Sequence, residues 1–209
     1  MSNVLVPGGR DVRGTLTDPD DATALVVACP PHPQQRGSRS DSRLVAVSDA
    51  LAEAGIASLR FDYGPWDDGY GECTDVQNAL HWASERYDRV GLFGYSFGAT
   101  LAILAAASTD YTLEAVSALA PTDKLAADLD AREALTTLEC PIQVVYGERD
   151  TTVNWEPIVS HLRERTPTTD AETATVDLVP IAGDHFFVSQ ESTVATAVSE
   201  FFASRVGAR

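Results

Sequence analysis

Gly94-Tyr95-Ser96-Phe97-Gly98 is the stretch that decides the fold. A strand-like run, residues 89–93, precedes it, and an Ala- and Leu-rich helical run, residues 99–107, follows it. A Gly-x-Ser-x-Gly pentapeptide between a strand and a helix is typical of a nucleophile elbow, a tight turn that projects the serine hydroxyl above the sheet. The glycines lack the Cβ atoms that would collide where strand and helix crowd together. The pattern predicts that Ser96 is a nucleophile, and it requires a base, an acid and an oxyanion hole elsewhere in the chain.

Length and composition predict one globular domain spanning residues 1–209. The chain is long enough for one sizeable core, and its hydrophobic content of 44% fits a globular protein. The sequence has no apolar run of the length that spans a bilayer, and its first residues resemble no secretory signal. We therefore expect a soluble, cytoplasmic protein, either a monomer or a small homo-oligomer.

The charge balance is strongly acidic. Acidic residues number 31 against 15 basic ones, which gives a formal net charge of -16. Nucleic acids and anionic membranes bind basic patches, so neither is an expected partner. Lys124 is the only lysine, and an acidic excess with almost no lysine resembles proteins of salt-loving organisms, because concentrated salt screens self-repulsion. A GC-rich genome also favours Arg over Lys, but we favour the halophile interpretation.

The cysteines do not form a recognisable site. Cys29, Cys73 and Cys140 are odd in number and widely separated, which does not fit a disulfide framework. No Cys-x-x-Cys or His-rich spacing suggests a metal site. We expect neither a metal nor a cofactor.

Apolar runs alternate with helical patterns along most of the chain. After a hairpin-like opening within residues 4–17, the predicted strands are residues 24–29, 56–63, 89–93, 115–120, 141–146 and 174–180. The predicted helices are residues 44–54, 74–86, 99–107, 123–137, 154–165 and 188–205. This alternation predicts an α/β fold, with a mostly parallel central sheet and helices on both faces. The segment between Ala120 and Pro141 is too short for a separate lid domain.

The remaining catalytic candidates follow strands, where ligands of parallel sheets bind. Asp150 follows the strand ending at residue 146, and His185 follows the strand ending near Ile181. The chain order Ser, Asp, His is the order of the α/β-hydrolase fold, in which the imidazole deprotonates the serine and the carboxylate orients the imidazole. Asp123, after the strand 115–120, is the rival acid, and we favour Asp150.

The oxyanion hole is expected to use two main-chain N–H groups. One belongs to Phe97, the residue after the nucleophile, and the other to the loop that follows strand 24–29. Three prolines in that loop have no N–H to donate, which leaves Gln34 as the first choice and His32 as the alternative. By position, His32, Tyr95 and Trp66 are candidate substrate-binding residues.

Motifs along nearly the whole chain resemble those of small α/β hydrolases related to dienelactone hydrolase. The matching residues are Pro31-His32-Pro33, Leu59-Arg60-Phe61-Asp62-Tyr63, Gly71-Glu72 with Asp75, Gly94 to Ala99, Gly147 with Asp150 and Val153, and Gly183 with His185-Phe186-Phe187. Two loops depart from the group: residues 34–37 lack its paired glycines, and the shorter loop after Tyr63 carries Trp66. The resemblance implies the α/β-hydrolase fold, a triad of Ser96, Asp150 and His185, and hydrolysis of ester-like bonds.

The first functional hypothesis is a serine hydrolase that cleaves esters or thioesters of small soluble acyl compounds through an acyl-enzyme, which water then releases. The second is a non-catalytic ligand-binding protein on a hydrolase scaffold, since fold does not dictate function. A third keeps the triad and changes the bond to an amide, a peptide or a carbon–carbon bond. We favour the first, because a complete set of candidate catalytic groups is present.

Overall fold

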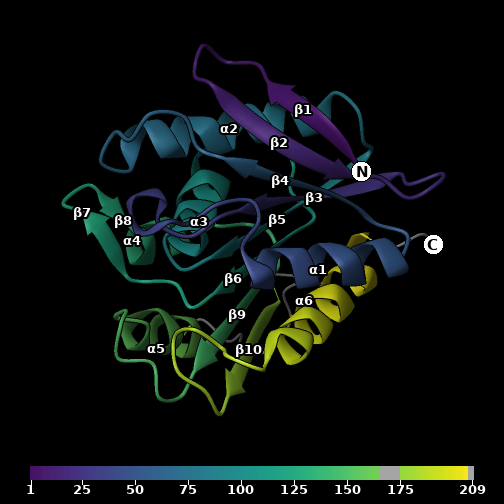
Figure 1. Cartoon of the computed structure of the whole chain (residues 1–209). Coiled ribbons are helices and arrows are strands. Elements are labelled where there is room, and N and C mark those ends of the chain that lie inside the picture. Colours follow the sequence, from purple (N-terminus) through teal and green to yellow (C-terminus); the bar gives the residue numbers. More distant parts are fainter. Residues whose placement is uncertain (165–174, 207–209) are drawn as a thin grey trace.

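An eight-stranded sheet lies at the centre of the computed structural model, which describes residues 1–164 and 175–206 (Figure 1). Its strands stand in the order β1-β2-β4-β3-β5-β6-β9-β10, and β2 runs antiparallel to both of its neighbours while the others pair in parallel. The strands are β1 (Ser2–Val6), β2 (Val12–Thr17), β3 (Ala24–Cys29), β4 (Ala57–Asp62), β5 (Arg89–Tyr95), β6 (Ala115–Leu119), β9 (Ile142–Gly147) and β10 (Val176–Ile181). The predicted mostly parallel sheet is confirmed.

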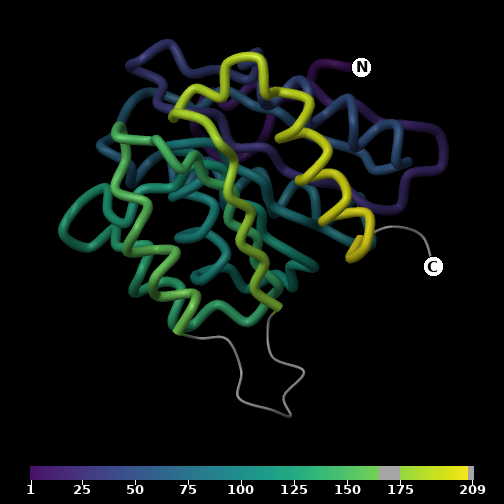
Figure 2. The backbone as a smooth tube through the Cα atoms, turned by 90° about the horizontal axis from the view of Figure 1, so that it is seen from below, coloured from purple at the N-terminus to yellow at the C-terminus, as the bar shows by residue number. Residues whose placement is uncertain are grey.

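Helices cover both faces of the sheet. They are α1 (Ser42–Glu53), α2 (Tyr70–Ser84), α3 (Phe97–Ser108), α4 (Ala131–Leu135), α5 (Glu156–Glu164) and α6 (Glu191–Val206). Strand β3 shows why two layers are needed, since its residues are buried on both sides. Leu25 and Val27 pack with α2 and α3, whereas Val26 and Ala28 pack with α1 and α6. Figure 2 shows α6 running beside α1 on their shared face.

The segment predicted as a helix over residues 123–137 is different in the structure. It forms a small hairpin of β7 (Lys124–Ala126) and β8 (Leu129–Asp130), and only then the short α4. The Lys124 ammonium lies 3.3 Å from the Asp130 carboxylate across the hairpin. Asp130 also caps α4, because its carboxylate accepts the N–H groups of Arg132 and Glu133. One aspartate therefore closes the hairpin and sets the start of the helix.

Other boundaries differ by a few residues. Helix α2 begins at Tyr70, four positions before the predicted start at Thr74, and this places Glu72 inside the helix. The short 3₁₀ helix η1 (Pro33–Gln35) lies in the loop after β3. Arg165 and Ala174, at the ends of a predicted helix and a predicted strand, lie outside the described residues.

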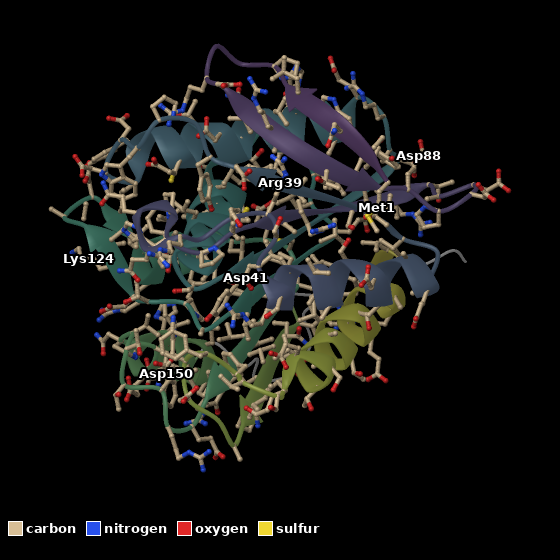
Figure 3. The ribbon with its side chains drawn as sticks, viewed as in Figure 1. Met1, Arg39, Asp41, Asp88, Lys124 and Asp150 are labelled. Carbon is tan, nitrogen blue, oxygen red and sulfur yellow. The ribbon has the colours of Figure 1, made fainter. Side chains whose placement is uncertain are left out.

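In the view of Figure 3, side chains ending in oxygen lie all round the periphery of the molecule. Lys124, the only lysine, lies on the β7–β8 hairpin at one end of the molecule. Within residues 1–164 and 175–206, no helix is both long and apolar enough to cross a bilayer.

Candidate active site

Ser96 occupies a strained turn between β5 and α3. Its φ of 56° and ψ of -120° lie in a region that a residue with a side chain rarely adopts, at a cost of about 1–3 kcal/mol. The N–H of Ser96 donates to the Leu119 carbonyl at 2.8 Å, which ties the turn to β6. A Cβ on Gly94 would collide with the Gly98 carbonyl, and one on Gly98 with the carbonyls of β3 and its loop. The elbow therefore needs both glycines.

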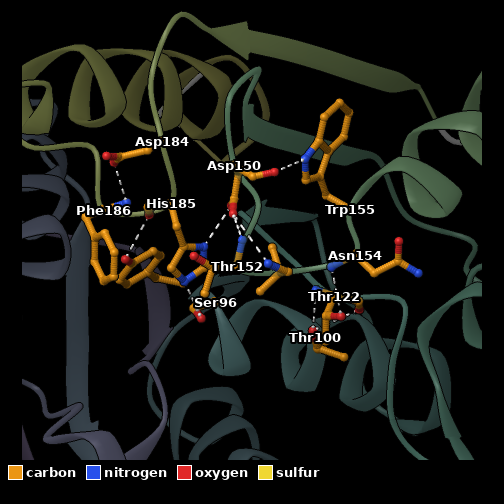
Figure 4. A network of polar contacts seen from close by, with 12 residues as sticks. Ser96, Thr100, Thr122, Asp150, Thr152, Asn154, Trp155, Asp184, His185 and Phe186 are labelled. Carbon is orange, nitrogen blue, oxygen red and sulfur yellow. Dashed lines mark hydrogen bonds and ion pairs between the residues drawn. The ribbon is translucent and has the colours of Figure 1, made fainter.

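A continuous hydrogen-bonded chain links Ser96, His185 and Asp150 (Figure 4). Ser96 Oγ lies 2.9 Å from His185 Nε2, and His185 Nδ1 lies 2.7 Å from Asp150 Oδ2. His185 and Asp150 are each 5% exposed. The structure brings together the three residues that the sequence selected, in the connectivity that serine activation requires.

Main-chain hydrogen bonds hold Asp150 in one orientation. It lies just after β9, and its Oδ1 accepts the N–H of Thr152 at 2.8 Å and of Val153 at 3.4 Å. Trp155 Nε1 donates to the Asp150 carbonyl at 3.1 Å. Because Oδ1 is used in this way, Oδ2 is left to face His185.

Contacts from two other elements hold the loop that carries His185. The Tyr95 hydroxyl donates to the His185 carbonyl at 3.0 Å, and Arg43 Nη1 donates to the Phe186 carbonyl at 3.0 Å. Burial raises the pKa of Tyr95 to about 12, so its hydroxyl stays protonated and able to donate. The Arg43 guanidinium lies over the Tyr95 ring, 4.6 Å from its centroid, and pairs with Asp41 at the start of α1.

The rival acids have other partners. Asp123 accepts from Asn154 Nδ2 at 3.0 Å, and Asp184 accepts the N–H of Phe186 at 3.0 Å. Neither carboxylate is bonded to His185 in the part of the chain that the structure describes. Asp150 is therefore the acid that the geometry selects.

The oxyanion side is only partly as predicted. The Phe97 N–H, at the start of α3, has no acceptor among the described residues, so it is free to bind a ligand. The predicted second donor, Gln34, is engaged instead, since its N–H points to His32 Nδ1 at 3.3 Å. The next three N–H groups bond to carbonyls of the same loop, and they belong to Gln35, Arg36 and Gly37. Since the neighbouring prolines have no N–H, the N–H of His32, the alternative donor, is left without an acceptor in the described ranges.

A cavity of about 270 Å³ opens beside Ser96. Of the three residues predicted to bind substrate, His32 and Tyr95 line this cavity and Trp66 does not. The Trp66 ring stacks on the His32 ring, with centroids 4.7 Å apart and planes inclined by 29°. Trp66 therefore supports a residue of the site instead of facing the cavity itself.

The cavity wall also includes residues that the sequence did not indicate as part of the site, among them Arg36, Thr152 and Phe186. Phe186 adjoins His185 and is 54% exposed, which is unusual for such a large apolar side chain. Its position next to the histidine in Gly-x-His-Phe-Phe was the available signal. No sequence motif marks Arg36 or Thr152, because only the path of their loops brings them to the cavity. Among the described residues, no three His, Cys, Asp or Glu side chains are grouped to hold a metal ion.

Comparison with known families gives a clear match. A model of the dienelactone hydrolase family matches residues 69–205 of the 209. The chain belongs to the dienelactone hydrolase family. The match includes the elbow, Asp150 and His185, whereas the loop that carries His32 lies before it. A search of curated proteins finds no match to this sequence.

Solved structures show the same fold at low sequence identity. Est1E from Butyrivibrio proteoclasticus has a TM-score of 0.81 with 18% identity, covering 100% of both chains. Dienelactone hydrolase from Anabaena variabilis has a TM-score of 0.77 with 24% identity, and the match covers 98% of the present chain and 97% of the Anabaena chain. XC6422 from Xanthomonas campestris, described as a serine hydrolase without lid, has a TM-score of 0.78 with 20% identity over 97% and 94% of the two chains. The α/β-hydrolase fold without a lid domain is thereby confirmed.

Proposed function

We propose that this protein is a serine hydrolase that cleaves carboxylic esters or thioesters of small acyl compounds through an acyl-enzyme. The observation that carries the proposal is the hydrogen-bonded chain from Ser96 Oγ through His185 to Asp150. His185 Nε2 accepts the proton as Ser96 Oγ attacks the carbonyl carbon, and then returns it to the leaving group. A water molecule is activated by the same imidazole and releases the acyl group from Ser96.

The N–H groups of Phe97 and His32 stabilise the oxyanion in this proposal. Both lack an acceptor in the described residues, and His32 lines the same cavity as Ser96. Two free N–H donors aimed at the developing charge are the usual means of stabilising a tetrahedral intermediate. Gln34 is not proposed, because its N–H is used by His32 Nδ1.

The size of the site favours short acyl groups. The cavity of about 270 Å³ is smaller than most sites for drug-sized ligands, which have about 300–1,000 Å³. Membership of the dienelactone hydrolase family supports hydrolysis. Esters and thioesters rank above amides, since residues 1–164 and 175–206 form no propeller or cap domain of the sort that selects peptides.

A fluorophosphonate probe and an acyl-length series of p-nitrophenyl esters and thioesters test the proposal in molar KCl. Wild type should be labelled and should hydrolyse acetate and butyrate esters fastest, whereas Ser96→Ala should be unlabelled and inactive. Ser199→Ala, a change on the surface of α6, is the matched control and should behave as wild type. A folded wild type that is neither labelled nor active would favour a binding protein, and the fastest turnover on long acyl chains would contradict the small-substrate proposal.

A further inference from the structure

Two buried carboxylates of α2 lie outside the catalytic triad and remain without a role in the proposed chemistry. Glu72 and Asp75 are both 0% exposed. Both belong to the motif of Gly71-Glu72 with Asp75 that resembles small α/β hydrolases. Burying two carboxylates is costly unless they are paired and hydrogen-bonded. Their partners therefore indicate what they do.

Both carboxylates hold the main chain of the loop over residues 64–69. Glu72 Oε1 accepts the N–H of Asp67 at 2.9 Å, and Oε2 accepts the N–H of Gly69 at 2.8 Å. Asp75 Oδ2 accepts the N–H of Gly64 at 2.9 Å. The loop is thus fixed at its beginning, middle and end by one turn of a helix.

The cation that balances this pair comes from the N-terminal hairpin. Arg10, between β1 and β2, donates from Nε to Asp75 Oδ1 at 2.6 Å, and its Nη2 lies 3.9 Å from Glu72 Oε1. The same Nη2 donates to the Pro65 carbonyl, which adds a further main-chain tie. A Cβ on Gly71 would collide with the Arg10 guanidinium, so this glycine makes room for the cation. The fold therefore provides both the partners and the space that the Arg10 guanidinium needs.

Trp66 is the loop residue whose position this network decides. Its ring stacks on His32 with centroids 4.7 Å apart and lies 5.7 Å from the Phe97 ring, while His32 and Phe97 are 4.9 Å apart. His32 and Phe97 are the two residues whose N–H groups form the proposed oxyanion hole. The three rings therefore connect the fixed loop to the oxyanion donors.

We propose that Arg10, Glu72 and Asp75 are positioning residues for the oxyanion hole: they fix residues 64–69 so that Trp66 stacks on His32 and holds the His32 N–H beside the Phe97 N–H. This inference rests on the proposed hydrolase function. The network touches no reacting atom and acts only through Trp66 and His32. The network should therefore affect kcat and not substrate binding, because the oxyanion develops only as the reaction approaches the transition state.

Glu72→Gln is the primary test, with Glu191→Gln in the first turn of α6 as the matched control. The amide keeps the size of Glu72 but places an NH₂ group against one of the two loop N–H groups, so residues 64–69 lose an anchor. A loosened oxyanion donor should lower kcat by about tenfold, less than the 10²–10³-fold loss on deleting a donor, with KM within about twofold of wild type. Glu191→Gln should leave kcat and KM unchanged. Denaturant unfolding of each variant shows how much folded protein the assay contains.

A double-mutant cycle with Trp66→Ala separates this role from a merely structural one. Trp66→Ala alone should lower kcat by about tenfold, and Glu72→Gln should add little in that background, because both remove the same support. Trp66→Phe, which keeps a ring for stacking, should recover most of the activity. Full kcat in Glu72→Gln, or losses that multiply in the double variant, would overturn the proposal.

The His32 ring protons provide a readout that does not need turnover. Stacked on Trp66, they should resonate upfield of the other histidines, with His32→Gln to assign the signal, and the shift should vanish in Glu72→Gln and Trp66→Ala. A shift retained in Glu72→Gln would contradict the proposal. A wild type without activity but with a shift that depends on Glu72 would sink the proposed hydrolase, and the catalytic part of this inference with it, while upholding the contact network.

Discussion

The two sides of Ser96 are built differently. On the base side, His185 and Asp150 follow adjacent strands, β10 and β9, and hydrogen bonds made directly to these residues and their loops hold them. On the oxyanion side, His32 depends on Trp66, which depends on Glu72, Asp75 and Arg10, far apart in the sequence. Each side nevertheless has one buried tyrosine whose hydroxyl donates to a loop carbonyl at 3.0 Å, Tyr95 to His185 and Tyr63 to Pro30. On the base side, hydrogen bonds reach His185, Asp150 and their loops directly, some of them from Tyr95 and Arg43. On the oxyanion side, support reaches His32 through the Trp66 ring.

The largest effect is expected on the base side. Asp150→Asn keeps the side-chain shape but favours the wrong tautomer of His185, so kcat should fall by about 10⁴-fold. Steady-state kinetics on a short acyl ester measures this, with unfolding curves to show that the variant is folded. A loss comparable to the tenfold change expected for Glu72→Gln would mean that the two sides do not differ in the way described.

Removing salt should affect the whole protein, and therefore both the base side and the oxyanion side of Ser96. With a net charge of -16, dilution from molar KCl into low salt should increase self-repulsion and lower the free energy of unfolding until structure is lost. Circular dichroism and activity followed during dialysis measure this loss. Full stability and activity at low salt would sink the halophile interpretation and favour genome composition as the origin of the arginine bias.

The two tyrosines give a matched pair of smaller changes. Tyr63→Phe and Tyr95→Phe each remove one buried hydrogen bond and should each lower the free energy of unfolding by about 1 kcal/mol. Because Asp150 also holds His185, Tyr95→Phe should lower kcat less than Tyr63→Phe, whose loop carries the His32 donor. Equal kcat values for the two variants would remove the distinction between a base side held by several direct hydrogen bonds and an oxyanion side held through Trp66.

The smallest effect concerns pH. Burial lowers the pKa of His32 below its ordinary value of 6.5, with a partial opposing effect from Glu72. The unfolded chain then binds a proton more readily than the folded protein, so the free energy of unfolding should decrease as pH falls from above 6.5 toward the folded pKa. His32→Gln should reduce that slope slightly, and NMR titration of the His32 ring should place its pKa below 6.5. A titration above 6.5 would indicate that the ring is not buried under Trp66.

The difference between the two sides also explains what could be predicted from the sequence. β3 was predicted at its observed bounds because a strand buried on both faces is a continuous apolar run. Ser96, Asp150 and His185 were found because in parallel sheets the loops after the strands meet at one edge. Both inferences use only local pattern and topology.

The errors occur where side chains from distant segments decide the structure. Gln34 was chosen by counting prolines, and only the fold shows that its N–H is used by the His32 ring. Position alone predicts Trp66 at the cavity, whereas the structure shows its ring stacked on His32 and does not place it among the residues lining the cavity. The helix expected over residues 123–137 gives way to a hairpin closed by Lys124 and Asp130, an ion pair that weak amphipathic spacing does not reveal.

The position of Arg10 has a consequence for handling and shortening this protein. A chain trimmed to begin at β3 would keep the parallel strands and the Ser96–His185–Asp150 chain, and by sequence it would look like a complete enzyme. It would lack the guanidinium that pairs with Asp75 and lies near Glu72 under the loop of residues 64–69. If Arg10 has the positioning role proposed above, the N-terminal hairpin contributes to the oxyanion side, and a tag or fusion attached there is expected to lower kcat although it lies far from Ser96 in the sequence.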